Sequence, residues 1–175
     1  NGGSSYGDVE ISAQVRSIRE DDTADAGLIF RAADLGTGSN ELKGYYVGID
    51  SYRDILLLGK LNNNWTGLSS VSMDIAADQY YKLTVKAVDN HIEVYVNDVL
   101  KIDYTDNSDP YLSGAVGFRA NNTTADFKQV EFEERFSVSV SGSAVVGDVL
   151  TAHISPAGAT AGYQWQYSTD GTQWN

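Results

Sequence analysis

Cysteine is absent from the 175 residues of this chain, which excludes disulfide bonds and thiolate metal sites. Proline occurs only twice, and no apolar run reaches the roughly 18 residues of a membrane-spanning helix. Basic residues are also few: 12 lysines and arginines stand against 24 acidic residues, which gives a net charge of −12. Such a surface repels phosphate backbones and anionic lipids, so we expect neither a nucleic-acid nor a membrane partner.

Histidine is scarce as well, which bears on catalysis. His91 and His153 lie far apart in the sequence, so neither a Ser-His-Asp arrangement nor a zinc site is expected. The strongest catalytic candidates are Glu131 and Glu133, which would share one face of a strand about 7 Å apart. Laminarinase-like sandwich enzymes carry a third carboxylate at the next alternating position, where this chain has Arg135. A charged, solvated edge strand explains the run better, and we expect no enzymatic activity.

Strand-forming residues are abundant by contrast. The chain contains 11 tyrosines and 17 glycines, and apolar residues alternate with polar ones along most of it. Turns rich in Asn and Asp separate these stretches, and no segment keeps a helical period. The sequence therefore predicts an all-β protein, an antiparallel β-sandwich or jelly roll. Strands are expected at residues 9–18, 26–33, 44–50, 53–61, 66–73, 80–88, 91–97, 99–103, 114–120 and 125–134.

The character of the sequence changes after Arg135. Charge becomes sparse, and three further strands are expected at 136–142, 147–155 and 162–168, the last containing Trp165. This segment resembles the opening half of an immunoglobulin-like repeat of bacterial surface proteins, in which such a tryptophan fills the core. We therefore expect a sandwich over residues 1–135 and the truncated N-terminal part of an immunoglobulin-like domain over 136–175.

Carbohydrate recognition requires an aromatic face together with rigid carboxylate and guanidinium groups. The motifs Phe30-Arg31-Ala32 and Phe118-Arg119-Ala120 repeat one context, in which phenylalanine is expected to face the core and arginine the outside. The alternative is that these are ordinary surface charges. The charged candidates at or beside strand cores are Glu10, Arg31, Asp50, Lys60 and Arg119.

Aromatic candidates accompany these charges. Trp65 follows three asparagines and is expected in a loop, either as an exposed sugar platform or packed over a sheet edge. The alternation around Val47 predicts that Tyr45 faces the core and that Tyr46 faces outward with Asp50.

An acidic cluster raises the question of calcium. Asp103, Asp106 and Asp109 offer oxygen ligands, but their spacing matches no established calcium loop. Turn-forming carboxylates are the preferred interpretation, and a structural calcium ion is the only cofactor considered.

Several runs together point to a known family. AGLIFRAAD (26–34), GYYVGID (44–50), YYKLTVKAVDNHIEVYVNDVLKIDYTD (80–106) and YLSGAVGFRANNTTADFKQVEF (111–132) resemble family 66 of the carbohydrate-binding modules. That family belongs to the concanavalin-like, laminin-G-like sandwiches, and the resemblance covers about residues 6–134. It implies a non-catalytic module of a larger secreted bacterial glycosidase that binds the non-reducing-end sugar of a fructan or another furanoside. The alternative is a laminin-G-like structural or adhesion domain of a bacterial surface protein.

The resemblance also implies a site. Glu10 would supply a first-strand carboxylate, Arg31 a second-strand guanidinium and Asp106 a further carboxylate, all converging on one outward pocket with Tyr46 or Trp65 as its apolar wall. Asp50 and Lys60 match polar positions of the family pattern. Asparagines stand at 121–122, where the fructan-binding pattern has an aromatic residue, so other terminal sugars such as arabinofuranose stay open. Replacing Arg31 should then abolish binding without lowering stability.

Overall fold

The computed structural model describes residues 4–18, 24–38, 40–143, 145 and 147–155, together with 162, 164, 166, 172 and 173. Every regular element in these ranges is a strand, and they contain no helix able to cross a membrane. The predicted all-β class is confirmed. The strands are β1 Val9–Ile18, β2 Asp25–Ala33, β3 Lys43–Asp50, β4 Ile55–Asn62, β5 Trp65–Ser72, β6 Tyr80–Val88, β7 His91–Val96, β8 Val99–Thr105, β9 Ala115–Asn121, β10 Thr124–Glu134, β11 Ser137–Ser141 and β12 Thr151–Ser155.

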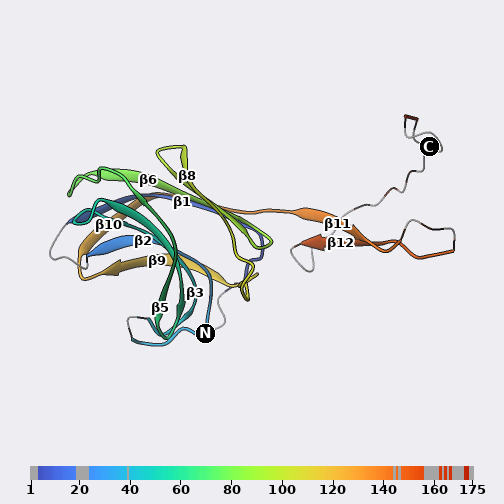
Figure 1. Ribbon diagram of the computed structural model, residues 1–175, viewed down its shortest axis with the longest axis horizontal. Helices are drawn as coiled ribbons and strands as arrows, with labels where there is room; N and C mark the ends of the chain where they lie inside the picture. The colour runs from blue at the N-terminus through green and yellow to red at the C-terminus, as the bar shows by residue number, and fades with distance from the viewer. Residues whose placement is uncertain are drawn as a thin grey trace.

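Ten of these strands form two five-stranded antiparallel sheets that face each other as a sandwich (Figure 1). Sheet I has the order β10-β1-β6-β7-β8, and sheet II has the order β5-β4-β3-β2-β9. Sheet II places β2 between β3 and β9, so segments distant in the sequence share one face. This arrangement brings the candidate site together.

The core follows directly from the alternation in the sequence. In β1 the apolar side chains of Ile11 and Val15 point between the sheets, and in β2 those of Leu28 and Phe30 do the same. Burying apolar area is the main force that holds the two layers together. The outer faces of both sheets therefore remain available for polar groups and for ligands.

The segment after the sandwich forms a separate hairpin. β11 and β12 pair with each other, and neither joins sheet I or sheet II. In Figure 1 this hairpin extends away from the sandwich. The backbone N–H of Arg135 still donates to the carbonyl of Asp8 at 2.8 Å, so the sandwich contacts continue as far as that residue. Trp165 lies outside the described residues, and the immunoglobulin-like assignment and the boundary at 135 stay predictions.

Candidate functional site

Arg31 does not lie on an open face of the sheet, contrary to expectation. β2 carries a bulge here, because its pairing with both β3 and β9 shifts register around Arg31. The residue has a positive φ of 51°, a strained conformation for a long side chain. A bulge redirects the side chain that simple alternation would send outward. Arg31 is consequently only 1% exposed.

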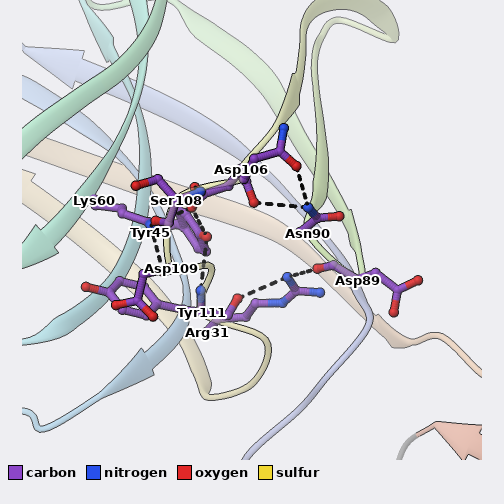
Figure 2. Close-up of polar contacts among 10 residues, drawn as sticks. Arg31, Tyr45, Lys60, Asp89, Asn90, Asp106, Ser108, Asp109 and Tyr111 are labelled. Carbon is purple, nitrogen blue, oxygen red and sulfur yellow. Dashed lines mark hydrogen bonds and ion pairs between the residues drawn. The ribbon is translucent and has the colours of Figure 1, made fainter.

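The Arg31 guanidinium instead joins three segments at one end of the sandwich (Figure 2). Its Nε donates to the Gly7 carbonyl at 3.0 Å, and its Nη1 donates to the carbonyls of Tyr111, at 3.1 Å, and Asp89. It also forms a buried ion pair with Asp8 at 3.2 Å. Burial lowers the pKa of Arg31, and the Asp8 carboxylate opposes that shift. These groups hold the sandwich closed at this end.

The buried Asp106 and the partly exposed Lys60 form a second ion pair beside Arg31 (Figure 2). The Lys60 ammonium lies 2.6 Å from the Asp106 carboxylate, and the Tyr45 hydroxyl donates to the same oxygen at 2.5 Å. Burial alone would raise the pKa of Asp106, but the hydrogen bonds from Lys60, Tyr45 and the Ser108 N–H outweigh it and lower that pKa. Lys60 also donates to the backbone carbonyls of Ser108 and Asp109, so the pair anchors this loop.

The expected convergence of Glu10, Arg31 and Asp106 on one outward pocket is therefore not what the structure has. Glu10 lies on the outer face of sheet I, where it pairs with Arg135 and, at 3.7 Å, with Lys86. The carboxylate that pairs with Arg31 is that of Asp8 and not that of Glu10. Arg31 and Asp106 do lie in one cluster, but both are buried and their polar groups bind other parts of the protein.

A different set of residues surrounds a hollow of about 240 Å³ on the outer face of sheet II. Strands β2, β3, β4, β5 and β9 all contribute, because neighbouring strands bring their outward positions side by side. Three of the predicted residues, Tyr46, Trp65 and Arg119, belong to it. Its lining is Asp25, Asn40, Tyr46, Arg53, Leu57, Trp65, Arg119 and Asn121.

Trp65 provides the exposed aromatic surface of this hollow. It is the first residue of β5 rather than part of a loop, and 36% of it is exposed. Its indole lies over Gly59 on the neighbouring strand, where any Cβ would overlap the ring. The ring of Tyr46 meets it edge-on, with centroids 6.1 Å apart. Glycine at position 59 thus permits the indole to lie against the sheet as a platform.

Tyr46 faces outward as expected but is completely covered. Its hydroxyl donates to the Asp25 carboxylate at 2.5 Å, and the Arg119 guanidinium stacks 4.8 Å from its ring centroid. Burial is the main reason that the pKa of Tyr46 lies well above its ordinary value of 10.0. Tyr46 is therefore a support that holds Asp25, Arg119 and Trp65 in place.

Asp25 and Arg119 form the charged part of the hollow. Arg119 donates to Asp25 at 3.2 Å and to the side-chain oxygen of Asn40 at 3.1 Å. The Asn121 amide donates to the second oxygen of Asp25 at 3.2 Å. Burial raises the pKa of Asp25, although the hydrogen bond from Tyr46 and the charge of Arg119 act in the opposite direction. The result is a guanidinium and a carboxylate in fixed positions at the hollow, each with 13% of its side chain exposed.

Asp50 acts on this hollow through Arg53. Its carboxylate is buried and accepts the backbone N–H groups of Tyr52 and Arg53, each at 2.9 Å, which shapes the turn between β3 and β4. It also pairs with the Arg53 guanidinium at 3.3 Å. Asp50 therefore does not line the hollow but orients a residue that does.

No sequence pattern predicts Asp25, Asn40 or Asn121 as site residues. Asp25 is the first residue of β2, where an acidic residue is unremarkable, and Asn40 lies in the connection before β3. Strands β2 and β9 pair in the register that sets Gly27 opposite Arg119. The same register places Asp25 opposite Asn121. The doublet of asparagines at 121–122 was the one available signal.

Two of the three aspartates considered as calcium ligands, Asp103 and Asp106, are engaged separately. Asp106 binds Lys60 and Tyr45, whereas Asp103 lies 2.7 Å from His91 Nε2. On the outer face of sheet I, His91, Glu93 and Asp103 each offer one ligand atom within 4.8 Å of the others, an arrangement that a divalent cation could use.

The carboxylates of Glu131 and Glu133 line another hollow on sheet I, together with Glu10 and Ser12. The Ser12 hydroxyl donates to Glu131 at 3.4 Å. Glu131 and Glu133 lie on β10 at the edge of the sheet, as expected for a solvated, charged edge strand.

Comparison with known proteins places this geometry in context. The family model described as "3-keto-alpha-glucoside-1,2-lyase-like domain" matches residues 2–133. An uncharacterized protein of Methanocaldococcus jannaschii, MJ0945, is 27% identical over 128 residues, which make up 72% of this chain and 54% of that protein. The chain thus spans about half the length of this curated relative.

Solved structures share the fold. The carbohydrate-binding module CBM66 of Bacillus subtilis is 21% identical, with a TM-score of 0.64 over 74% of this chain and 77% of the module. A B. subtilis protein of unknown function with a galectin-like fold is 13% identical, with a TM-score of 0.63 over 75% of this chain and 74% of that one. Sheep galectin-11 is 13% identical, with a TM-score of 0.51 over 74% of this chain and 95% of the galectin. These likenesses confirm the jelly-roll sandwich.

Proposed function

We propose, given that the chain belongs to the 3-keto-alpha-glucoside-1,2-lyase-like domain family, that its sandwich is a non-catalytic carbohydrate-binding domain. One observation carries the proposal: an exposed indole and a fixed guanidinium–carboxylate pair, from Trp65, Arg119 and Asp25, border one hollow on sheet II. The likeness of the sandwich to the carbohydrate-binding module CBM66 and to galectin-11 supports the same class of ligand.

The chemistry of the hollow suits a sugar. A sugar ring presents C–H groups on its faces, which pack on an indole, and hydroxyls at its edge, which accept from a guanidinium and donate to a carboxylate. Affinity for one ring is small, so the protein groups must be ordered before binding. Tyr46, Asn40 and Asn121 supply that order through their bonds to Asp25 and Arg119.

The residues lining the hollow also favour binding over catalysis. Asp25 is the one carboxylate among them, and it is already paired with Arg119. Both histidines lie elsewhere, His91 on β7 and His153 on β12. The family description favours a second candidate, a lyase acting on 3-keto-glucosides. Product release from such a substrate that disappears in Asp25→Asn would replace our proposal with that one.

The finer parts of the proposal concern context. The domain would belong to a larger exported glycosidase and hold the enzyme at the non-reducing end of its polysaccharide. Furanosides, including fructans and arabinofuranosides, are the first ligands to test, because the sequence resembles family 66 of the binding modules.

A glycan panel with a Trp65→Ala variant tests the proposal directly. The wild-type chain should be retained on at least one immobilised glycan. Truncation of a central aromatic residue at a binding site costs about 2 kcal/mol or more, so Trp65→Ala should bind at least about thirtyfold more weakly. Phe132→Ala is the matched control, because Phe132 is equally exposed at 36% but lies on sheet I. Absence of retention on every glycan would favour a structural or adhesive domain.

Binding should also be lost on acidification before the fold is lost. Because burial raises the pKa of Asp25 above 3.8, this carboxylate takes up its proton at a higher pH than an ordinary aspartate. Protonation removes both a ligand acceptor and the ion pair that orients Arg119. We expect retention to decline as the pH falls toward 3.8 while the near-UV circular dichroism stays constant.

Protonation of Asp25 and protonation of Asp106 change the free energy of unfolding in opposite directions, which separates the loss of binding from the loss of the fold. A carboxyl with a raised pKa binds its proton more readily in the folded state, so protonating Asp25 does not unfold the protein. Asp106 has a lowered pKa, and its contribution to stability is lost only as the pH falls through that lower value. Asp25→Asn should bind weakly at every pH with a flat profile. A wild-type profile that follows the unfolding curve would contradict this assignment.

A further inference from the structure

The hollow beside Arg119 continues past Trp65 into a second one. This second hollow, of about 520 Å³, lies over β4 and β5, and it shares Arg53, Leu57 and Trp65 with the first. Gly67, Ser69 and Ser70 of β5 form part of its lining. Because the two hollows have a common border, they form one groove that crosses the strands of sheet II.

Trp65 divides this groove and faces both halves of it. Its six-membered ring lies over Gly59, and its Nε1 atom is 3.9 Å from the position of a Cβ on Gly67. The indole therefore spans the distance between these two glycines, which are paired across β4 and β5. A flat apolar ring in this position can pack against one sugar on each side.

The far half of the groove is open and carries little charge. β5 is an edge strand of sheet II, so no further described strand closes the groove there. The floor combines the apolar Leu57 with the bare backbone at Gly67, and the hydroxyls of Ser69 and Ser70 lie beside it. Arg53 is the one charged side chain among the described residues that line it. Apolar surface beside hydroxyl groups matches a neutral sugar ring rather than an ion.

We infer that the ligand is a glycan chain of at least two rings and not a single sugar. One ring occupies the hollow of Asp25 and Arg119, and the next lies over Gly67 and Ser70 on the far side of Trp65. This inference rests on the proposed function and adds the size and path of the ligand. Affinity must then rise with chain length until the second hollow is filled.

Filling the second hollow with protein provides the test. Gly67 has no positive φ, and an added Cβ meets nothing closer than the indole nitrogen, so Gly67→Val should fold and occupy the space. The probes are fructo-, arabino-, xylo- and gluco-oligosaccharides from the monosaccharide to the hexasaccharide, titrated calorimetrically into the whole chain. In the series that binds, we expect the tetrasaccharide to bind about tenfold more tightly than the monosaccharide, or about 1.4 kcal/mol.

Gly67→Val should remove that gain, so that this variant binds the tetrasaccharide no more tightly than the monosaccharide. Gly117→Val is the matched control, because position 117 on β9 is equally free of neighbours and lines neither hollow. Ser70→Leu fills the same hollow from an exposed position, without an aromatic face, should Gly67→Val melt early. Equal affinity for every chain length, or a gain that survives both blocking variants, overturns this inference and leaves the proposed function standing. Failure of every series to bind overturns the proposed function itself.

Discussion

Arg31→Ala is expected to lower the free energy of unfolding by about 3–5 kcal/mol, because it removes one member of a buried ion pair. The Asp8 carboxylate would lose its cation while remaining buried. The carbonyls of Gly7 and Tyr111 would lose donors in the same place. Thermal melting should therefore begin about 6–20 °C earlier, as scaled for a chain of this size.

Two further variants make this result interpretable. Arg31→Lys keeps the charge but cannot reproduce the fork that reaches several acceptors at once, so we expect it to recover only part of the lost stability. Lys43→Ala removes a half-exposed lysine whose partner, Asp34, is also largely exposed, and it should change stability by less than about 1 kcal/mol. Melting of Arg31→Ala at the wild-type temperature would show that the buried network contributes nothing. The sequence-based expectation of an unchanged melting temperature is thus reversed.

The fold could be predicted from the sequence because alternating apolar and polar residues indicate strands with one buried face and one exposed face. Ile11 and Val15, or Leu28 and Phe30, are spaced so that only one face of each strand is apolar. The antiparallel class followed from the short Asn- and Asp-rich connections. The order of the strands within each sheet did not, since nothing local indicates that β9 pairs with β2.

The site was harder to predict, because alternation along one strand shows neither a bulge nor the burial of a loop residue. Alternation assigns Arg31 to the outer face, but a one-residue bulge turns it inward, and the sequence has no glycine there to signal the bulge. Asp106 belongs to a loop, so periodicity says nothing about its burial. Arg119 was placed correctly because β9 is regular through that position.

Tyr45 and Tyr46 show how one strand serves stability and binding separately. Consecutive residues of β3 point to opposite faces. Tyr45 lies on the core side and holds Asp106, whereas Tyr46 lies on the outer side and holds Asp25. Changes to the inner cluster should therefore act on stability, and changes to the outer cluster on ligand affinity.

Arg119→Ala is expected to weaken glycan binding by about 10- to 100-fold with a smaller loss of stability than Arg31→Ala. A hydrogen bond to a charged group contributes about 1.5–3 kcal/mol, and about 1.4 kcal/mol corresponds to a tenfold change in affinity. The guanidinium is fixed by Asp25, Asn40 and the ring of Tyr46, so its free N–H groups need no ordering when the sugar arrives. Arg119→Lys should recover little, because an ammonium lacks the planar fork.

Arg16→Ala provides the matched control for this experiment. Arg16 also stacks on a tyrosine, with its guanidinium carbon 5.0 Å from the Tyr80 ring centroid, and also pairs with aspartates, Asp78 and Asp126, but on sheet I. Losing it should cost similar local contacts without touching the groove. Titration of both variants with the best oligosaccharide of the panel, alongside their melting curves, separates binding from folding. Equal affinities for Arg119→Ala, Arg16→Ala and the wild type would remove Arg119 from the site, and with it the reason to place the sugar on sheet II.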